Sequence, residues 1–115
     1  MKKHYTDSFG VEWSEYPDIQ LDSKKKYDWD ISKSRLELVL GFPLDFLLNK
    51  KVIEIGCGPG RFSEILKKYC KDLTLVDSSD AIKHNPATHD KNVISYQKDF
   101  TDEAFIEKNK NKFDI

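Results

Sequence analysis

The chain has 115 residues, which is enough for one small domain around a single hydrophobic core. Its 19 basic and 20 acidic residues leave a net charge of −1, so nothing in its bulk charge attracts nucleic acid or an anionic membrane. No apolar run is as long as a transmembrane helix, and the basic start is not followed by the apolar core of a signal peptide. Cys57 and Cys70 form no CxxC pair. We therefore expect a cytoplasmic protein with free thiols and no membrane partner.

Residues 1–31 are rich in aromatic side chains but lack a regular apolar pattern. Gly10 and Pro17 make a long helix unfavourable there, although Phe9, Trp13 and Tyr16 share helical spacing. Two interpretations of this segment remain open. The rings pack on the flank of a domain formed by residues 32–115, or Phe9 and Trp13 cover a cleft as a lid.

From residue 32 onward, the hydrophobic spacing predicts alternating helices and strands. Helices are expected over residues 32–40 (Ser32 as N-cap), 43–48, 62–69 and 102–108, with a short helical piece after Ser78 or Ser79 that Pro86 ends. Strands are expected over residues 52–55, 73–76 and 93–97, and a fourth begins at 113–115. Strands that alternate with helices indicate right-handed crossovers, and hence an α/β fold with a parallel sheet and flanking helices.

A glycine cluster follows the first predicted strand directly, with Gly56, Gly58 and Gly60 at alternate positions. Glycine tolerates positive φ and lets a ligand approach the backbone closely, and ligands of parallel sheets lie at the carboxyl ends of the strands. A dinucleotide fingerprint would need a small residue at position 61 and free amides at the helix start. Arg61 and Pro59 stand there instead. An NAD-dependent oxidoreductase is therefore the less favoured alternative, and an ordinary tight turn also stays open.

With an acid before the glycines, this run resembles motif I of class I S-adenosylmethionine-dependent methyltransferases: Glu54-Ile55-Gly56-Cys57-Gly58-Pro59-Gly60. The resemblance covers about residues 50–115. It implies a Rossmann-like fold, incomplete here as the N-terminal half of the class I fold, with S-adenosylmethionine as the cofactor. It further implies that Gly56, Cys57, Gly58 and Gly60 line the cofactor and that Glu54 faces its amino end.

Two further acids end predicted strands. Asp77 follows Gly56 at the interval where nucleotide-binding folds place a carboxylate for the ribose hydroxyls. The resemblance implies that Asp99 accepts a hydrogen bond from the adenine amine and that the amide of Phe100 meets the ring edge. Ser78 stands where relatives often carry an apolar residue that packs on adenine. Both acids could instead be turn or capping residues.

The catalytic residues are unknown, because S-adenosylmethionine carries its own leaving group and the protein need only orient the acceptor. His4, His84 and His89 lie in polar stretches, and no spacing indicates a metal site.

We expect the methyl acceptor to be a small molecule or a glycan rather than nucleic acid. The chain alone is expected to be inactive, so a non-catalytic adenosine-cofactor-binding fragment is the alternative. An apolar sheet edge beside residues 52–55 favours homo-oligomers.

Overall fold

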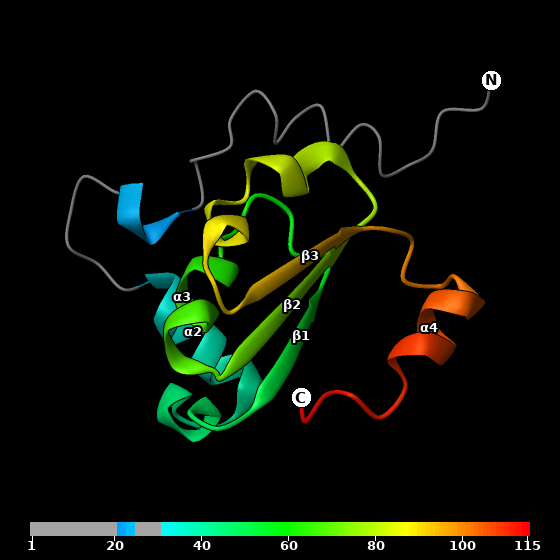
Figure 1. Cartoon of the computed structure of the whole chain (residues 1–115). Helices are drawn as coiled ribbons and strands as arrows, with labels where there is room; N and C mark the ends of the chain where they lie inside the picture. Colours follow the sequence, from blue (N-terminus) through cyan, green and yellow to red (C-terminus); the bar gives the residue numbers. More distant parts are fainter. Residues whose placement is uncertain (1–20, 25–30) are drawn as a thin grey trace.

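The computed structural model describes residues 21–24 and 31–115 (Figure 1). The predicted lid residues Phe9 and Trp13 lie outside this part of the chain. The elements, with 3₁₀ helices written η, are η1 (Asp22–Lys24), α2 (Ile31–Leu40), η2 (Leu44–Leu47), β1 (Lys51–Ile55), α3 (Ser63–Tyr69), β2 (Asp72–Asp77), η3 (Asp80–His84), η4 (Pro86–His89), β3 (Val93–Gln97) and α4 (Glu103–Asn109).

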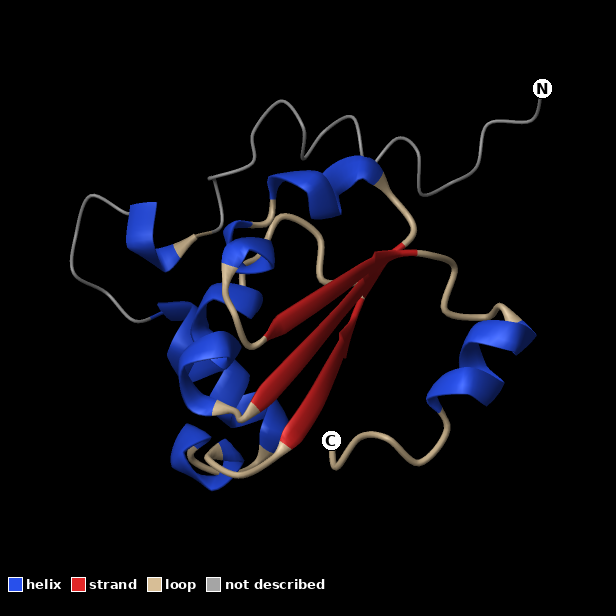
Figure 2. Cartoon of the chain, viewed as in Figure 1, coloured by secondary structure: helices blue, strands red, loops and turns tan. Residues whose placement is uncertain are grey.

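The three strands form one parallel sheet in the order β1-β2-β3 (Figure 2). Val52 pairs with Leu73, and Leu73 pairs with Val93, so these three apolar side chains share one face of the sheet. β2 is buried along most of its length because it has a neighbour on both sides. The α/β fold with a parallel sheet, predicted from the alternation of strands and helices, is confirmed.

The last residues return to the other edge of β1. The Ile115 amide donates to the Lys51 carbonyl at 3.4 Å, and the Ile115 carbonyl accepts from the Ile53 amide at 2.9 Å. These two bonds follow the pattern of a parallel pair, with Ile115 opposite Val52. No strand forms over residues 113–115, but Ile115 pairs with the edge of β1 that faces away from β2, which is where the predicted fourth strand would start. The order of strands reverses at this point, and in open α/β sheets such a reversal is where ligands bind.

Helices flank the sheet on both faces (Figures 1 and 2). The main core lies between the sheet and α2, α3 and η2, with Leu36, Leu47 and Leu66 packed near Val52 and Leu73. α4 lies on the opposite face, where the Phe105 ring meets the Tyr96 ring edge-on at 5.6 Å between centroids. This arrangement follows from the crossovers. β1, β2 and β3 advance in one direction, and the chain must then cross the other face to return to β1.

Two local predictions need correction. Ser32 does not cap its helix, because α2 begins at Ile31 and the buried Ser32 hydroxyl accepts from Arg61 Nε at 3.2 Å. Residues 43–48 form only the short 3₁₀ helix η2. The cap predicted at Ser78 or Ser79 is confirmed, because Ser79 caps η3 by accepting from the Ala81 amide. η3 ends at His84, before Pro86 as predicted, and Pro86 also begins η4, where its missing N–H costs nothing.

Candidate functional site

The glycine turn between β1 and α3 has an unusual backbone. Gly56, Gly58 and Gly60 have φ angles of 74°, 53° and 106°, in the region that side chains disfavour. A Cβ atom added to Gly56 or Gly58 would meet nothing within 4 Å. A Cβ atom on Gly60 would lie 2.6 Å from Asn85 Oδ1. The first two glycines thus leave open space above the strand ends, whereas Gly60 is required by packing.

Asp77 links the end of β2 to this turn. Its Oδ2 accepts from the Gly58 amide at 2.8 Å, and its Oδ1 accepts from the Ser79 amide and hydroxyl, each at 2.8 Å. A carboxylate offers about four lone-pair positions. These three bonds leave one position at Oδ2, on the side of the turn, for a further donor such as a ribose hydroxyl.

Glu54 lies in β1 with its carboxylate half-buried. Its Oε1 accepts from the Ser63 hydroxyl at 2.5 Å. The pKa of Glu54 is raised from 4.5 to about 7. Burial is the largest cause; the hydrogen bond from Ser63 acts in the opposite direction, and the charge of Asp77 adds to the rise. Among the described residues, neither Glu54 nor Asp77 forms a salt bridge. Two acids thus converge on one turn without a cation, and this arrangement suits a positively charged ligand.

Asn85 and Ser63 also belong to this site, and the sequence did not single them out. Both side chains are buried. Asn85 Nδ2 donates to the Gly58 carbonyl at 3.2 Å and to Ser63 Oγ at 2.9 Å, while Asn85 Oδ1 accepts from the Ala87 amide at 3.0 Å. The only available signal was the Asn-Pro pair at the start of η4, which is typical of a helix cap. Such a pair says nothing about a contact with the glycine turn.

Cys57 is buried inside the turn and carries a free thiol, as does Cys70 at the end of α3. Burial raises the pKa of the Cys57 thiol far above its ordinary value, and the charges of Glu54 and Asp77 raise it further. A thiol that stays protonated is a poor nucleophile. Cys57 therefore lines the turn as a small neutral side chain.

The remaining predicted site residues follow the ends of β2 and β3. Asp99 Oδ1 accepts from the Thr101 amide at 2.9 Å and from its hydroxyl at 2.6 Å, which is the bonding of a turn residue. Phe100 and Ser78 are exposed. Hydrogen bonds join Glu54, the glycine turn and Asp77 into one connected group, whereas Asp99 belongs to a separate turn at the same edge. Contacts of Ser78, Asp99 and Phe100 with adenine stay predictions.

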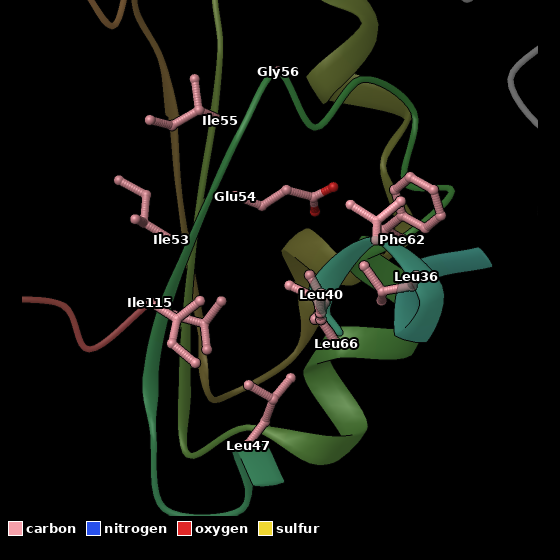
Figure 3. Close-up of a pocket in the computed structure, with 12 residues that line it drawn as sticks. Leu36, Leu40, Leu47, Ile53, Glu54, Ile55, Gly56, Phe62, Leu66 and Ile115 are labelled. Carbon is pink, nitrogen blue, oxygen red and sulfur yellow. The ribbon is translucent and has the colours of Figure 1, made fainter. Parts of the chain in front are cut away.

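A cavity of about 360 Å³ lies between α2 and β1 (Figure 3). Its walls are mostly apolar, and Glu54 carries the one ionisable side chain among the described residues that line it. The lining residues are Leu36, Val39, Leu40, Leu47, Val52, Ile53, Glu54, Ile55, Gly56, Phe62, Leu66 and Ile115. Figure 3 shows the Glu54 carboxylate pointing from β1 toward Phe62, away from Ile53 and Ile55. The acid thus meets the cavity from its glycine-turn end.

The other candidate groups do not converge. His84 and His89 are exposed, and His4 lies outside the described residues. Within residues 21–24 and 31–115, no group of three or more His, Cys, Asp or Glu side chains could hold a metal ion. Across the same residues, none of the helices combines the length and apolarity needed to cross a membrane.

Comparison with known proteins agrees with this geometry. The family model described as a methyltransferase domain matches residues 23–115. Among solved structures, the chain is similar to phosphoethanolamine N-methyltransferase 1 of Haemonchus contortus, determined in selenomethionine form with phosphoethanolamine and S-adenosylhomocysteine. The TM-score is 0.51 at 26% identity, over 80% of this chain and 21% of that chain, so the match spans about a fifth of the relative. No protein of curated function matches the sequence significantly. The chain belongs to the methyltransferase-domain family and has the Rossmann-like fold of the class I methyltransferases.

Proposed function

We propose that this chain binds S-adenosylmethionine at the glycine turn and supplies the cofactor-binding part of a methyltransferase. One observation carries the proposal. Glu54 and Asp77 converge on a glycine turn at the point where the strand order reverses, and neither acid has a cationic partner among the described residues. An adenosyl cofactor with a ribose, an ammonium group and a sulfonium supplies the hydroxyl donors and the positive charge that such a site lacks.

The residues present fit this cofactor. Oδ2 of Asp77 has room for a ribose hydroxyl, and the open space above Gly56 and Gly58 allows the ligand to approach the backbone. The Glu54 carboxylate can accept from the ammonium group of the methionine end. When bound, the cofactor supplies a methyl group activated by its positively charged sulfur, so the protein needs no nucleophile of its own. The chain's contribution is to bind and orient the cofactor and to keep water out with apolar walls.

The acceptor class is proposed from charge and from the solved relative. The net charge of −1 does not favour nucleic acid, and the relative was determined with a small molecule, phosphoethanolamine. We therefore propose a small molecule or glycan as acceptor, in a cytoplasmic enzyme. Because the match spans about a fifth of that relative, no residue of this chain is proposed to meet the acceptor.

Calorimetry on the intact protein tests the cofactor. S-adenosylhomocysteine should bind more tightly than NADH, and Asp77→Ala should weaken S-adenosylhomocysteine by about tenfold to a hundredfold, since it removes bonds to a charged group. Asp72→Ala is the matched control, because Asp72 is an exposed acid at the opposite end of the same strand. Tighter binding of NADH, or equal affinities of Asp77→Ala and Asp72→Ala, would contradict the proposal.

A further inference from the structure

We infer that Ser63, held by Asn85, is a positioning residue that orients the Glu54 carboxylate toward the amino group of the cofactor. The inference rests on the proposed function. It extends that function to two buried residues outside the glycine pattern, and it assigns the hydroxyl of Ser63 a role in recognising the cationic end of the ligand.

The bonds of Asn85 determine which group donates and which accepts in the chain of hydrogen bonds from Asn85 through Ser63 to Glu54. Asn85 Oδ1 accepts from the Ala87 amide, so the Nδ2 group is the one that faces Ser63 and the Gly58 carbonyl. Ser63 Oγ therefore accepts from Asn85 and has its single proton left to donate. That proton goes to Glu54 Oε1, at 2.5 Å.

Among the described residues, none donates a hydrogen bond to the second oxygen of Glu54, so that oxygen is left for a ligand. Oε1 is engaged by Ser63, and the carboxylate points into the cavity that the apolar side chains of α2 and α3 line (Figure 3). Among the described residues, the other titratable groups facing Glu54 are Asp77 on β2 and the Cys57 thiol in the turn, and neither can neutralise it. Without a donor on Oε1, the carboxylate would be free to rotate and would lose its only hydrogen bond among the described residues.

Ser63 is also well placed to hold this geometry rigidly. Its side chain is fully buried at the start of α3, and its partner Asn85 is 1% exposed. Asn85 in turn bonds the Gly58 carbonyl, so the acid and the glycine turn share one support. A support of this kind lowers the ordering cost of binding a ligand at both ends.

The test compares two ligands on the intact protein by calorimetry. S-adenosylhomocysteine carries the amino group, whereas methylthioadenosine has the same adenosine and thioether but no amino acid tail. Ser63→Ala should weaken S-adenosylhomocysteine by about tenfold and leave methylthioadenosine within about twofold, because only the former uses Glu54. Ser63→Thr, which restores the hydroxyl, should recover the affinity for S-adenosylhomocysteine.

Two further variants keep the test decisive. Ser63→Cys fills the same buried space with a weak donor and should show the same selective loss even if the alanine variant does not fold. Thr74→Val, which removes a hydroxyl from a buried position on the opposite face of the sheet, is the control and should bind both ligands normally. Equal loss for both ligands, or no loss for either, would overturn the inference. If the unaltered protein binds methylthioadenosine but not S-adenosylhomocysteine, the role of Glu54 fails while adenosine binding stands; if it binds neither, the proposed function fails first.

Discussion

Asn85 occupies the space that a side chain on Gly60 would need. Its Oδ1 lies 2.6 Å from the position of a Gly60 Cβ atom, and its Cγ lies 3.0 Å away. The amide cannot swing aside without losing its bonds to the Gly58 carbonyl, to Ser63 and to Ala87. Asn85, which comes much later in the chain, thus leaves room only for glycine at position 60.

The first prediction follows from this contact. Gly60→Ala should lower the free energy of unfolding by about 2–4 kcal/mol, since it combines an unfavourable φ with overpacking against a fixed side chain. Gly41→Ala is the matched control, because Gly41 also has a positive φ, of 78°, but nothing within 4 Å of an added Cβ. It should cost only about 1–2 kcal/mol. Urea denaturation measures the free energy of unfolding of both variants. Equal losses of stability would show that the Asn85 side chain moves aside for the new methyl group.

The second prediction separates ligand contact from folding. Gly58 has a φ of 53° and open space around an added Cβ, so Gly58→Ala should destabilise the fold by about 1–2 kcal/mol, much as Gly41→Ala does. Its affinity for S-adenosylhomocysteine should nevertheless fall by about tenfold or more, because the new methyl group projects where the ligand would lie. Gly41→Ala should bind normally. Unchanged affinity of Gly58→Ala would place the ligand elsewhere.

The third prediction concerns pH. The folded-state pKa of Glu54, about 7, lies above the ordinary value of 4.5, so the folded protein keeps its proton where the unfolded chain has lost it. The stability that Glu54 contributes is therefore full below about pH 4.5 and is lost as the pH rises through about 7. Glu54→Gln avoids this loss. It should be more stable than the unaltered protein by about 1–3 kcal/mol near pH 8, and the difference should shrink toward pH 4.5.

Denaturation curves measured across that pH range check the third prediction. Glu107→Gln, which removes a charge from the exposed surface of α4, is the control. Glu54→Gln should also bind S-adenosylhomocysteine less well, so stability and affinity are expected to move in opposite directions. A stability difference that does not change with pH would mean that Glu54 is ordinarily solvated.

Local patterns were sufficient to predict most of the architecture. The strand over residues 93–97 has the predicted bounds, β1 starts one residue earlier than predicted, and β2 is one residue longer at each end. The glycine turn and Asp77 were both predicted at the carboxyl ends of strands, and in the structure the Gly58–Asp77 hydrogen bond joins them there. These features depend on short-range periodicity and on backbone rules that a single sequence displays.

The supports of the site could not be predicted, for a physical reason. Ser63 and Asn85 are polar residues whose importance comes from burial and from partners 9 to 27 positions away. Serine and asparagine at exposed positions are ordinary capping residues. Ser32 is the opposite case, a residue that the sequence predicted as a cap and that is none. The helix starts one residue earlier, at Ile31, and the Ser32 hydroxyl accepts from Arg61 instead. Long-range packing decided these assignments.

The last prediction concerns the open edge of the sheet. β1 pairs with β2 on one side, and on its other side Lys51 and Ile53 form backbone hydrogen bonds with Asp114 and Ile115. Ile55, which continues this edge beyond those bonds, is 50% exposed, and unpaired apolar edges recruit further strands. The polypeptide of residues 1–115 should therefore self-associate, with an apparent size in gel filtration that grows with concentration. Ile55→Lys should restore a monomer by placing a charge on the edge. Leu38→Lys adds the same charge on α2, where Leu38 is 82% exposed, and should leave the association unchanged. A monomer whose apparent size does not change with concentration would show that the edge of β1 is protected. If Leu38→Lys restored a monomer and Ile55→Lys did not, the self-association would involve α2 rather than the edge of the sheet.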